Sequence, residues 1–197
     1  MRTKSFHLVH YASIILAALT HTAAAEDKDN PPFHLAPLVA LNEVVALVGD
    51  TDPPLVLPEE LELFKKIAAG QGSKCDEPDA VLVASGVADK ETRELYIAKI
   101  KKITFISSKV IGLRDTPEKK VSLLALYLLA TQFKSGFKDD QINIRTLLDE
   151  HKCNCVSSCV LFNLVGNQLG LKTRAVSVPG HEFLRMGDLM IGHLRAE

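Results

Sequence analysis

The chain has 197 residues, of which 47% are hydrophobic, 24% are charged and 6% are aromatic. A high apolar fraction with a formal net charge of −1 excludes a disordered chain, and 11 glycines and 9 prolines without any period exclude collagen-like and coiled-coil proteins. The 23 basic residues are matched by 24 acidic ones, so the charge gives no support for nucleic-acid binding.

Residues 1–25 have the three parts of a secretory signal peptide. Arg2 and Lys4 are basic, residues 8–19 are apolar, and small residues follow at Ala23–Ala25. The apolar part is shorter than the stretch of about 18 residues that a spanning helix needs, and an uncleaved N-terminal anchor is the alternative. Cleavage after Ala25 predicts an exported protein, periplasmic or secreted, without stable insertion in the membrane.

Residues 26–84 are predicted to form a helical N-terminal extension. An apolar run over residues 34–48 predicts a short helix, and the prolines of residues 50–58 predict a loop. Residues 59–69 carry acids early and lysines late, as a capped helix does. Residues 79–84 are apolar, in a pattern that fits either a helix or a strand.

Residues 89–111 have the pattern of a long helix. Its predicted apolar stripe consists of four residues, Leu95, Ala98, Ile103 and Ile106. The next helix is predicted from Thr116, a suitable N-cap before Pro117, to about Phe133. That segment is apolar nearly all round, so we expect it to be buried.

The rest of the chain predicts two helices followed by strands. Residues 143–150 read as a short helix with an Asn cap, and residues 156–169 as a helix that ends at Gly170. Residues 173–178, 181–186 and 189–194 then have the pattern of strands, separated by turns at Pro179-Gly180 and Gly187-Asp188. Helices followed by an antiparallel sheet indicate an α+β fold.

The residues with the clearest chemical potential are Cys155 at a predicted helix start and His181 at a predicted strand start. A helix N-terminus favours the thiolate through its backbone N–H groups and its partial positive charge. A nearby His can pair with that thiolate and later protonate a leaving group. The loop at Asn154 and the first-turn N–H groups are candidates for an oxyanion or positioning site.

Several short motifs of this chain resemble the transglutaminase-like superfamily. They are Leu147–Glu150 (LLDE), Asn154–Ser157 (NCVS), Leu169–Leu171 (LGL) and Val178–Phe183 (VPGHEF). The pattern is most similar to the bacterial branch related to SirB-type proteins. The motifs cover about residues 116–185, and residues 85–197 are taken as the transglutaminase-like domain.

This resemblance implies a papain-like α+β fold, with a core helix carrying Cys155 packed on a small antiparallel sheet. It implies that Cys155 is the nucleophile and His181 its base, without a metal or cofactor. The family reaction is acyl transfer on amide bonds of a protein or peptide, through a thioester that water or an amine resolves. A non-catalytic binding or structural module of the same fold is the alternative.

Two features depart from the family pattern. Cys153 stands where the family usually has Gly. The family's third residue is an Asp on the strand after the His strand, but a two-residue turn at Gly187-Asp188 would pair His181 with Leu194 and leave Asp188 in the turn. A domain truncated at its C-terminus, or a dyad whose His is oriented by a backbone group, is therefore expected.

Other chemistry of the same residues is possible. In an exported chain, disulfides are permitted among the four cysteines, Cys75, Cys153, Cys155 and Cys159. A bridge between Cys153 and Cys155 would remove the nucleophile. His151 with the last three cysteines is a candidate zinc set, although four ligands within nine residues are closer together than in usual zinc sites.

Overall fold

The computed structural model describes residues 57–71, 75–112, 116–178, 181–187 and 189–191. The predicted signal peptide, the apolar run of residues 34–48 and nearly all of the proline-rich loop lie outside these residues. None of the helices that the structure describes combines the length and apolarity needed to span a bilayer.

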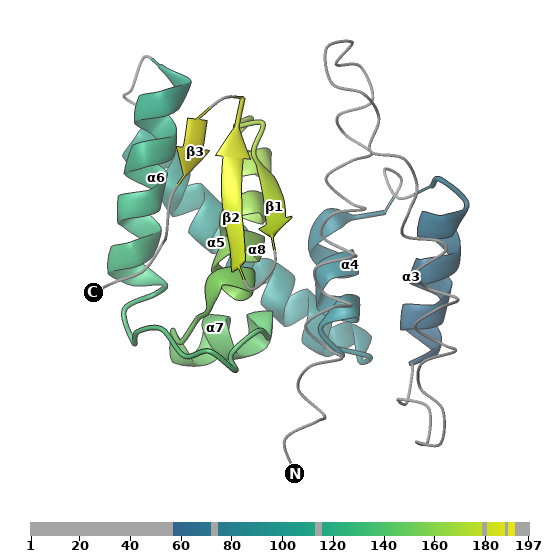
Figure 1. Ribbon diagram of the computed structural model, residues 1–197. Helices are drawn as coiled ribbons and strands as arrows, with labels where there is room; N and C mark the ends of the chain where they lie inside the picture. Colours follow the sequence, from purple (N-terminus) through teal and green to yellow (C-terminus); the bar gives the residue numbers. More distant parts are fainter. Residues whose placement is uncertain (1–56, 72–74, 113–115, 179–180, 188, 192–197) are drawn as a thin grey trace.

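The described elements are helices followed by strands (Figure 1). The helices are α3 (Pro58–Ala68), α4 (Glu77–Ala84), α5 (Lys90–Ile111), α6 (Pro117–Thr131), α7 (Ile144–Glu150) and α8 (Cys155–Gln168). The strands are β1 (Arg174–Val178), β2 (His181–Met186) and β3 (Leu189–Ile191). The predicted α+β class is confirmed at this level, and residues 79–84, which the pattern left open, are helical.

The sheet is antiparallel, with the strand order β1-β2-β3. Its register pairs Val178 with His181 across the first hairpin, and Met186 with Leu189 across the second. The second pairing is the one that a two-residue turn predicts. The predicted pairing of His181 with Leu194 involves a residue outside the described part of the chain.

Helix α8 is the centre of the fold. Every residue from Val156 to Gly166 is buried, and α8 packs against β2, β1 and the helices α5, α6 and α7. One face of the sheet is covered by α8, with α5 behind it (Figure 1). The helix ends as predicted, because Gly170 follows with φ of +74°, a conformation that glycine adopts at little cost.

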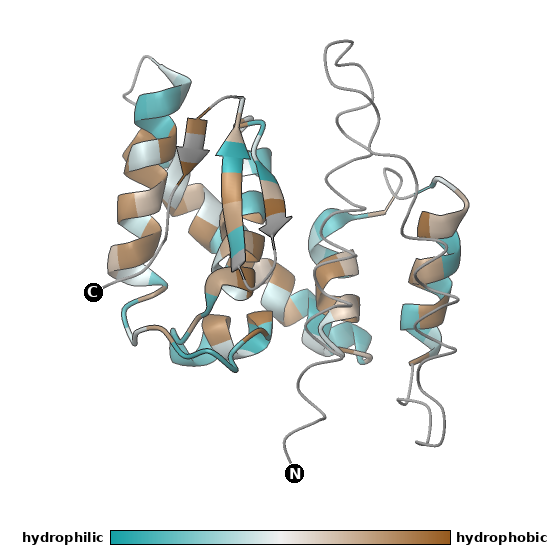
Figure 2. Cartoon of the chain, in the orientation of Figure 1, coloured by the Kyte–Doolittle hydropathy of each residue, from teal (hydrophilic) through white to brown (hydrophobic). Residues whose placement is uncertain are grey.

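Helix α6 begins as predicted but is buried on one side alone. The Thr116 hydroxyl accepts a hydrogen bond from the Lys119 N–H at 3.3 Å. The buried residues Val121, Leu124 and Leu128 follow a helical spacing, whereas the Leu126 side chain is 63% exposed. The expectation of a fully buried helix was wrong, because α6 lies at the edge of the fold, where hydrophobic residues reach its outer side (Figure 2).

Helix α5 uses a different stripe from the predicted one. The core stripe consists of Tyr96, Ile100, Ile103, Ser107 and Ile111. Of the four residues predicted to face the core, Ile103 alone is buried; Leu95 is 67% exposed and Ile106 is 39% exposed. The two stripes share Ile103 and both have helical spacing, so periodicity alone could not choose between them.

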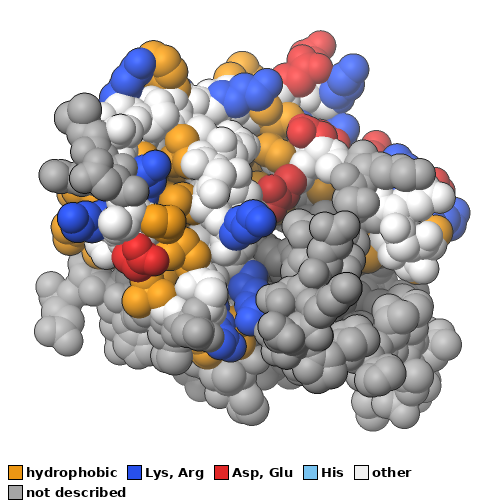
Figure 3. All heavy atoms as spheres, turned by 90° about the horizontal axis from the view of Figure 1, so that it is seen from above, with side chains coloured by type: hydrophobic (Ala, Val, Ile, Leu, Met, Phe, Trp, Pro, Cys, Tyr) orange, Lys and Arg blue, Asp and Glu red, His pale blue; other side chains and the backbone are white. Residues whose placement is uncertain are grey.

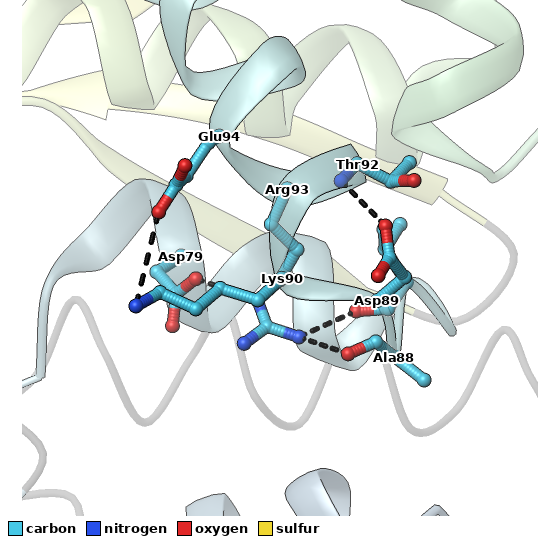
Figure 4. A network of polar contacts seen from close by, with 8 residues as sticks. Asp79, Ala88, Asp89, Lys90, Thr92, Arg93 and Glu94 are labelled. Atoms are coloured by element: carbon cyan, nitrogen blue, oxygen red, sulfur yellow. Dashed lines mark hydrogen bonds and ion pairs between the residues drawn. The ribbon is translucent and has the colours of Figure 1, made fainter.

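The junction of α4 and α5 is held by a largely buried arginine (Figure 4). The Arg93 side chain, 11% exposed, donates to the Asp79 carboxylate at 2.7 Å and to the carbonyls of Val87 and Ala88. Asp89 caps α5 by accepting from the Thr92 N–H at 2.7 Å. Helix α4, which belongs to the predicted extension, therefore packs directly on the next helix.

Candidate functional site

The start of α8 is fixed by a capping box. The Asn154 Oδ1 atom accepts from the Ser157 N–H at 3.0 Å, and the Ser157 Oγ atom accepts from the Asn154 N–H at 3.0 Å. Both side chains are buried. Cys155 is consequently the first helical residue, which confirms its predicted place at a helix N-terminus.

A loop over residues 136–141 lies along the residues that precede α8. The Lys138 N–H donates to the Cys153 carbonyl at 2.8 Å, and the Cys153 N–H donates to the Gly136 carbonyl at 3.3 Å. The Asn154 Nδ2 atom donates to the Asp139 carbonyl at 3.1 Å, and the Ser157 hydroxyl donates to the Gln141 carbonyl at 2.8 Å. These bonds commit the Asn154 amide to positioning the helix start.

Cys153 does not need the conformational freedom of the glycine that stands at this position in the motif pattern that the chain resembles. Among the described non-glycine residues, a positive φ occurs at His151 alone. The departure from the family pattern at Cys153 is therefore compatible with the backbone of this loop. The strained conformation lies two residues earlier, where His151, with φ of 59°, ends α7.

The three thiols near the start of α8 differ in exposure. Cys153 and Cys159 are buried, and Cys155 is half-buried. Burial, reinforced by the neighbouring Cys155, raises the pKa of the Cys153 thiol to about 11. Burial and the nearby Glu182 carboxylate also raise the pKa of Cys159. Cys155 is thus the one of the three that solvent reaches.

All four cysteines of the chain are free thiols. The structure therefore contains none of the disulfides that the sequence would permit among these cysteines. Among the described residues, no group of three or more His, Cys, Asp or Glu side chains could hold a metal ion. The structure thus does not assemble the candidate zinc set, although the His151 Nδ1 atom is buried and has no hydrogen-bond partner among the described residues.

His181 is the first residue of β2, and β2 packs against α8. This confirms the prediction that His181 lies on a strand antiparallel to the segment 173–178, of which residues 174–178 form β1, with the helix that carries Cys155 packed against the sheet. The His181 side chain lies outside the described atoms, as do Pro179-Gly180 and Asp188. The pairing of Cys155 with His181 stays a prediction.

A buried carboxylate next to His181 was missed from the sequence. Glu182 is 7% exposed and lies near Cys159, one helical turn from Cys155. The alternation of side chains along β2 could have indicated this burial. Glu182 and the buried Leu184 are two positions apart, so both side chains lie on the face of the strand toward α8. On β3, the described residues Leu189–Ile191 contain no acid that could act as the third residue.

The LLDE motif provides a contact between helices. Asp149 accepts hydrogen bonds from the Tyr96 hydroxyl at 2.6 Å and from the Lys99 ammonium group at 2.5 Å. Partial burial opposes ionisation of this carboxyl, but the two hydrogen bonds outweigh it and lower the pKa. Asp149 therefore ties α7 to α5.

No family model matches the chain, and no curated protein or solved structure matches it either. The transglutaminase-like resemblance accordingly stays a prediction from the motifs.

Proposed function

We propose that the chain is an exported transglutaminase-like cysteine hydrolase or acyltransferase, with Cys155 as nucleophile and His181 as base. The observation that carries this proposal is the half-buried Cys155 at the first position of the capped helix α8. Its neighbours Cys153 and Cys159 are buried, and the strand that begins with His181 packs against the same helix.

The backbone at the start of α8 offers donors to a developing oxyanion. The N–H groups of Ser157 and Ser158 are used by the Asn154 side chain and carbonyl. The N–H groups of Cys155 and Val156 make no hydrogen bond to any residue that the structure describes. Free N–H groups beside the sulfur are what an acyl-transfer site needs to stabilise a tetrahedral intermediate.

In the proposed reaction, the Cys155 sulfur forms a bond to the amide carbonyl carbon. The thiol proton passes to His181 and from there to the amine, which leaves as the carbon–nitrogen bond breaks. Water or a second amine then attacks the thioester, which yields an acid or a new amide and restores the thiol. The substrate class is a protein or peptide amide, and the site residues in this role are Cys155, His181 and, for positioning, Asn154.

The proposal is tested by the rate at which iodoacetamide modifies each thiol of the folded protein near pH 7, followed by mass spectrometry. Cys155 should react first. Cys75 is the control, because it is also half-buried but lies just before α4 and is not part of the helix that packs against the strand beginning with His181. The variant His181→Ala should slow the labelling of Cys155 and leave that of Cys75 unchanged. Equal rates at the two thiols, insensitive to His181, would contradict the proposal.

A non-catalytic module of the same fold is the second candidate. It is favoured by the Asn154 amide, which is bound on both sides as a structural cap, and by the lack of an acid among the described residues of β3. The same labelling experiment separates the two candidates, because a structural thiol needs no response to His181.

A further inference from the structure

Helix α5 has a second apolar face that points away from the core. Leu95, Phe105 and Ile106 are exposed by 67%, 63% and 39%, and Ala98 between them is also exposed. At about 100° per residue, Ala98 and Phe105 lie opposite the buried stripe that runs from Tyr96 to Ile111, and Leu95 and Ile106 lie beside them. No described helix or strand covers these side chains.

The same side of the helix is rich in lysine. From Leu95 to Ile111 the helix contains four lysines and no acid, while its first turns contain Glu91 and Glu94, of which Glu94 pairs with Lys90. Lys99 pairs with Asp149, while Lys101, Lys102 and Lys109 have no ion pair with any residue that the structure describes. The Lys109 ammonium group lies 5.1 Å from the centre of the Phe105 ring.

Apolar and basic side chains are thus mixed on one convex helix face. Figure 3 shows the molecule from above, where hydrophobic, basic and some acidic side chains are interspersed at the surface. Lysine stems can lie along apolar surface while the ammonium groups stay in water. The combination of Lys with Leu, Ile and Phe on one face is typical of helices that lie in the surface plane of a membrane.

We propose that the outer face of α5 docks the protein on an anionic lipid bilayer. Lipid phosphates complement the three unpaired lysines, and Leu95, Phe105 and Ile106 would enter the headgroup region. This interaction leaves the chain at the surface and needs no spanning segment. It is independent of the proposed chemistry at Cys155.

The charge argues against a second copy of the chain as the occupant. If two α5 helices packed antiparallel through this face, the central Lys101 and Lys102 of one helix would lie near the same lysines of the other. Like charges at close range oppose such a dimer. A bilayer rich in phosphatidylglycerol has the opposite charge, and a helix can lie along its surface with the lysines near the lipid phosphates.

The test is sedimentation of the full chain with vesicles of phosphatidylcholine alone or with added phosphatidylglycerol. We expect binding to the anionic vesicles that weakens at high salt. The double variant Lys102→Gln/Lys109→Gln should lower the partition coefficient by about fivefold for each lysine removed. Phe105→Ser should lower it by at least about tenfold, since an exposed ring contributes on the order of 1.5–3 kcal/mol when fully buried.

Matched controls keep the comparison specific to α5. Leu126→Ser removes an equally exposed apolar side chain from α6 and should leave binding unchanged. Lys119→Gln/Lys120→Gln removes two lysines at the start of α6 and should change binding much less than the α5 pair. Every variant shares residues 1–56, so any affinity of that segment for lipid cancels between them.

Three outcomes would overturn the proposal. The first is equal partition to neutral and anionic vesicles. The second is a loss of binding in the α6 variants as large as that in the α5 variants. The third is no vesicle binding together with a dimer in analytical ultracentrifugation that Phe105→Ser dissociates, because this would assign the face to a second copy of the chain.

Discussion

At the residue scale, Asn154 determines where α8 begins and hence where the Cys155 sulfur lies. Its amide oxygen satisfies the Ser157 N–H, and its amide nitrogen satisfies the Asp139 carbonyl of a distant loop. A side chain that bonds on both sides while 97% hidden from solvent has little freedom to move. Cys155 is therefore held by neighbours whose own positions are fixed.

Replacing Asn154 with Ala should lower the free energy of unfolding by about 2 kcal/mol, at the upper end for a helix cap, because buried partners lose their bonds. Urea unfolding measures this. The control is Thr116→Ala, which removes the exposed cap of α6 and should cost about 1 kcal/mol or less. Equal losses for the two variants would mean that the bond to Asp139 has no stabilising role.

The buried thiols make the stability depend on pH. The pKa of Cys153 is raised to about 11 in the folded state, while the unfolded thiol ionises near 8.5. Between these values the unfolded chain has released a proton that the folded chain keeps, so the stability is complete below about pH 8.5 and falls as the pH rises towards 11.

We expect Cys153 to account for about 1–2 kcal/mol of the stability lost between pH 7 and pH 10. Urea unfolding of the wild type and of Cys153→Ala at both pH values measures the difference. The variant should lose less stability with pH than the wild type, and Cys159 supplies much of the remaining slope. Parallel pH dependences in the two proteins would show that Cys153 ionises freely in the folded state.

At the element scale, the two stripes of α5 have different energetic roles. Ile100→Ala should lower the free energy of unfolding by about 2–5 kcal/mol, because the side chain is fully buried and its removal leaves a cavity. Leu95→Ala should change it by about 0.5 kcal/mol or less, since that side chain is largely exposed. Urea unfolding tests both. Comparable losses of unfolding free energy in the two variants would mean that Leu95 also belongs to the core, as the sequence predicted.

The local signals that begin and end elements could be predicted from the sequence. The caps at Thr116 and Asn143 and the glycine after α8 have the predicted roles, and the predicted helix start at Cys155 is found with Asn154 as its cap. They act through bonds to residues a few positions away, so a local pattern contains the necessary information. The turn at residue 187 likewise set the register of the second hairpin.

The features that depend on distant partners could not be predicted in the same way. The core stripe of α5 is decided by where α6, α7 and α8 pack, not by its own spacing. The loop of residues 136–141 reaches the start of α8 through bonds to Cys153, Asn154 and Ser157, more than ten residues away. A polar residue on a short strand was not expected to be buried, which is why Glu182 was missed.

At the scale of the whole molecule, the candidate site is made by segments that meet only after folding. Cys155 belongs to a helix start that a preceding loop fixes, and His181 belongs to a strand that reaches this helix after two reversals of the chain. The N–H groups of Cys155 and Val156 are aligned only because α8 is formed. None of these contributions exists in an unfolded chain.

The reactivity of Cys155 should therefore disappear with the fold. In the native protein near pH 7 we expect iodoacetamide to modify Cys155 faster than Cys75, and the buried Cys153 and Cys159 most slowly. In concentrated urea all four thiols should approach one rate, since each then ionises near 8.5. The variant His181→Ala should match the wild type in urea and differ from it in the native state at Cys155 alone. If Cys155 kept its advantage in urea, the cause would be its sequence neighbours, and the helix start and the His-bearing strand would have no part in activating it.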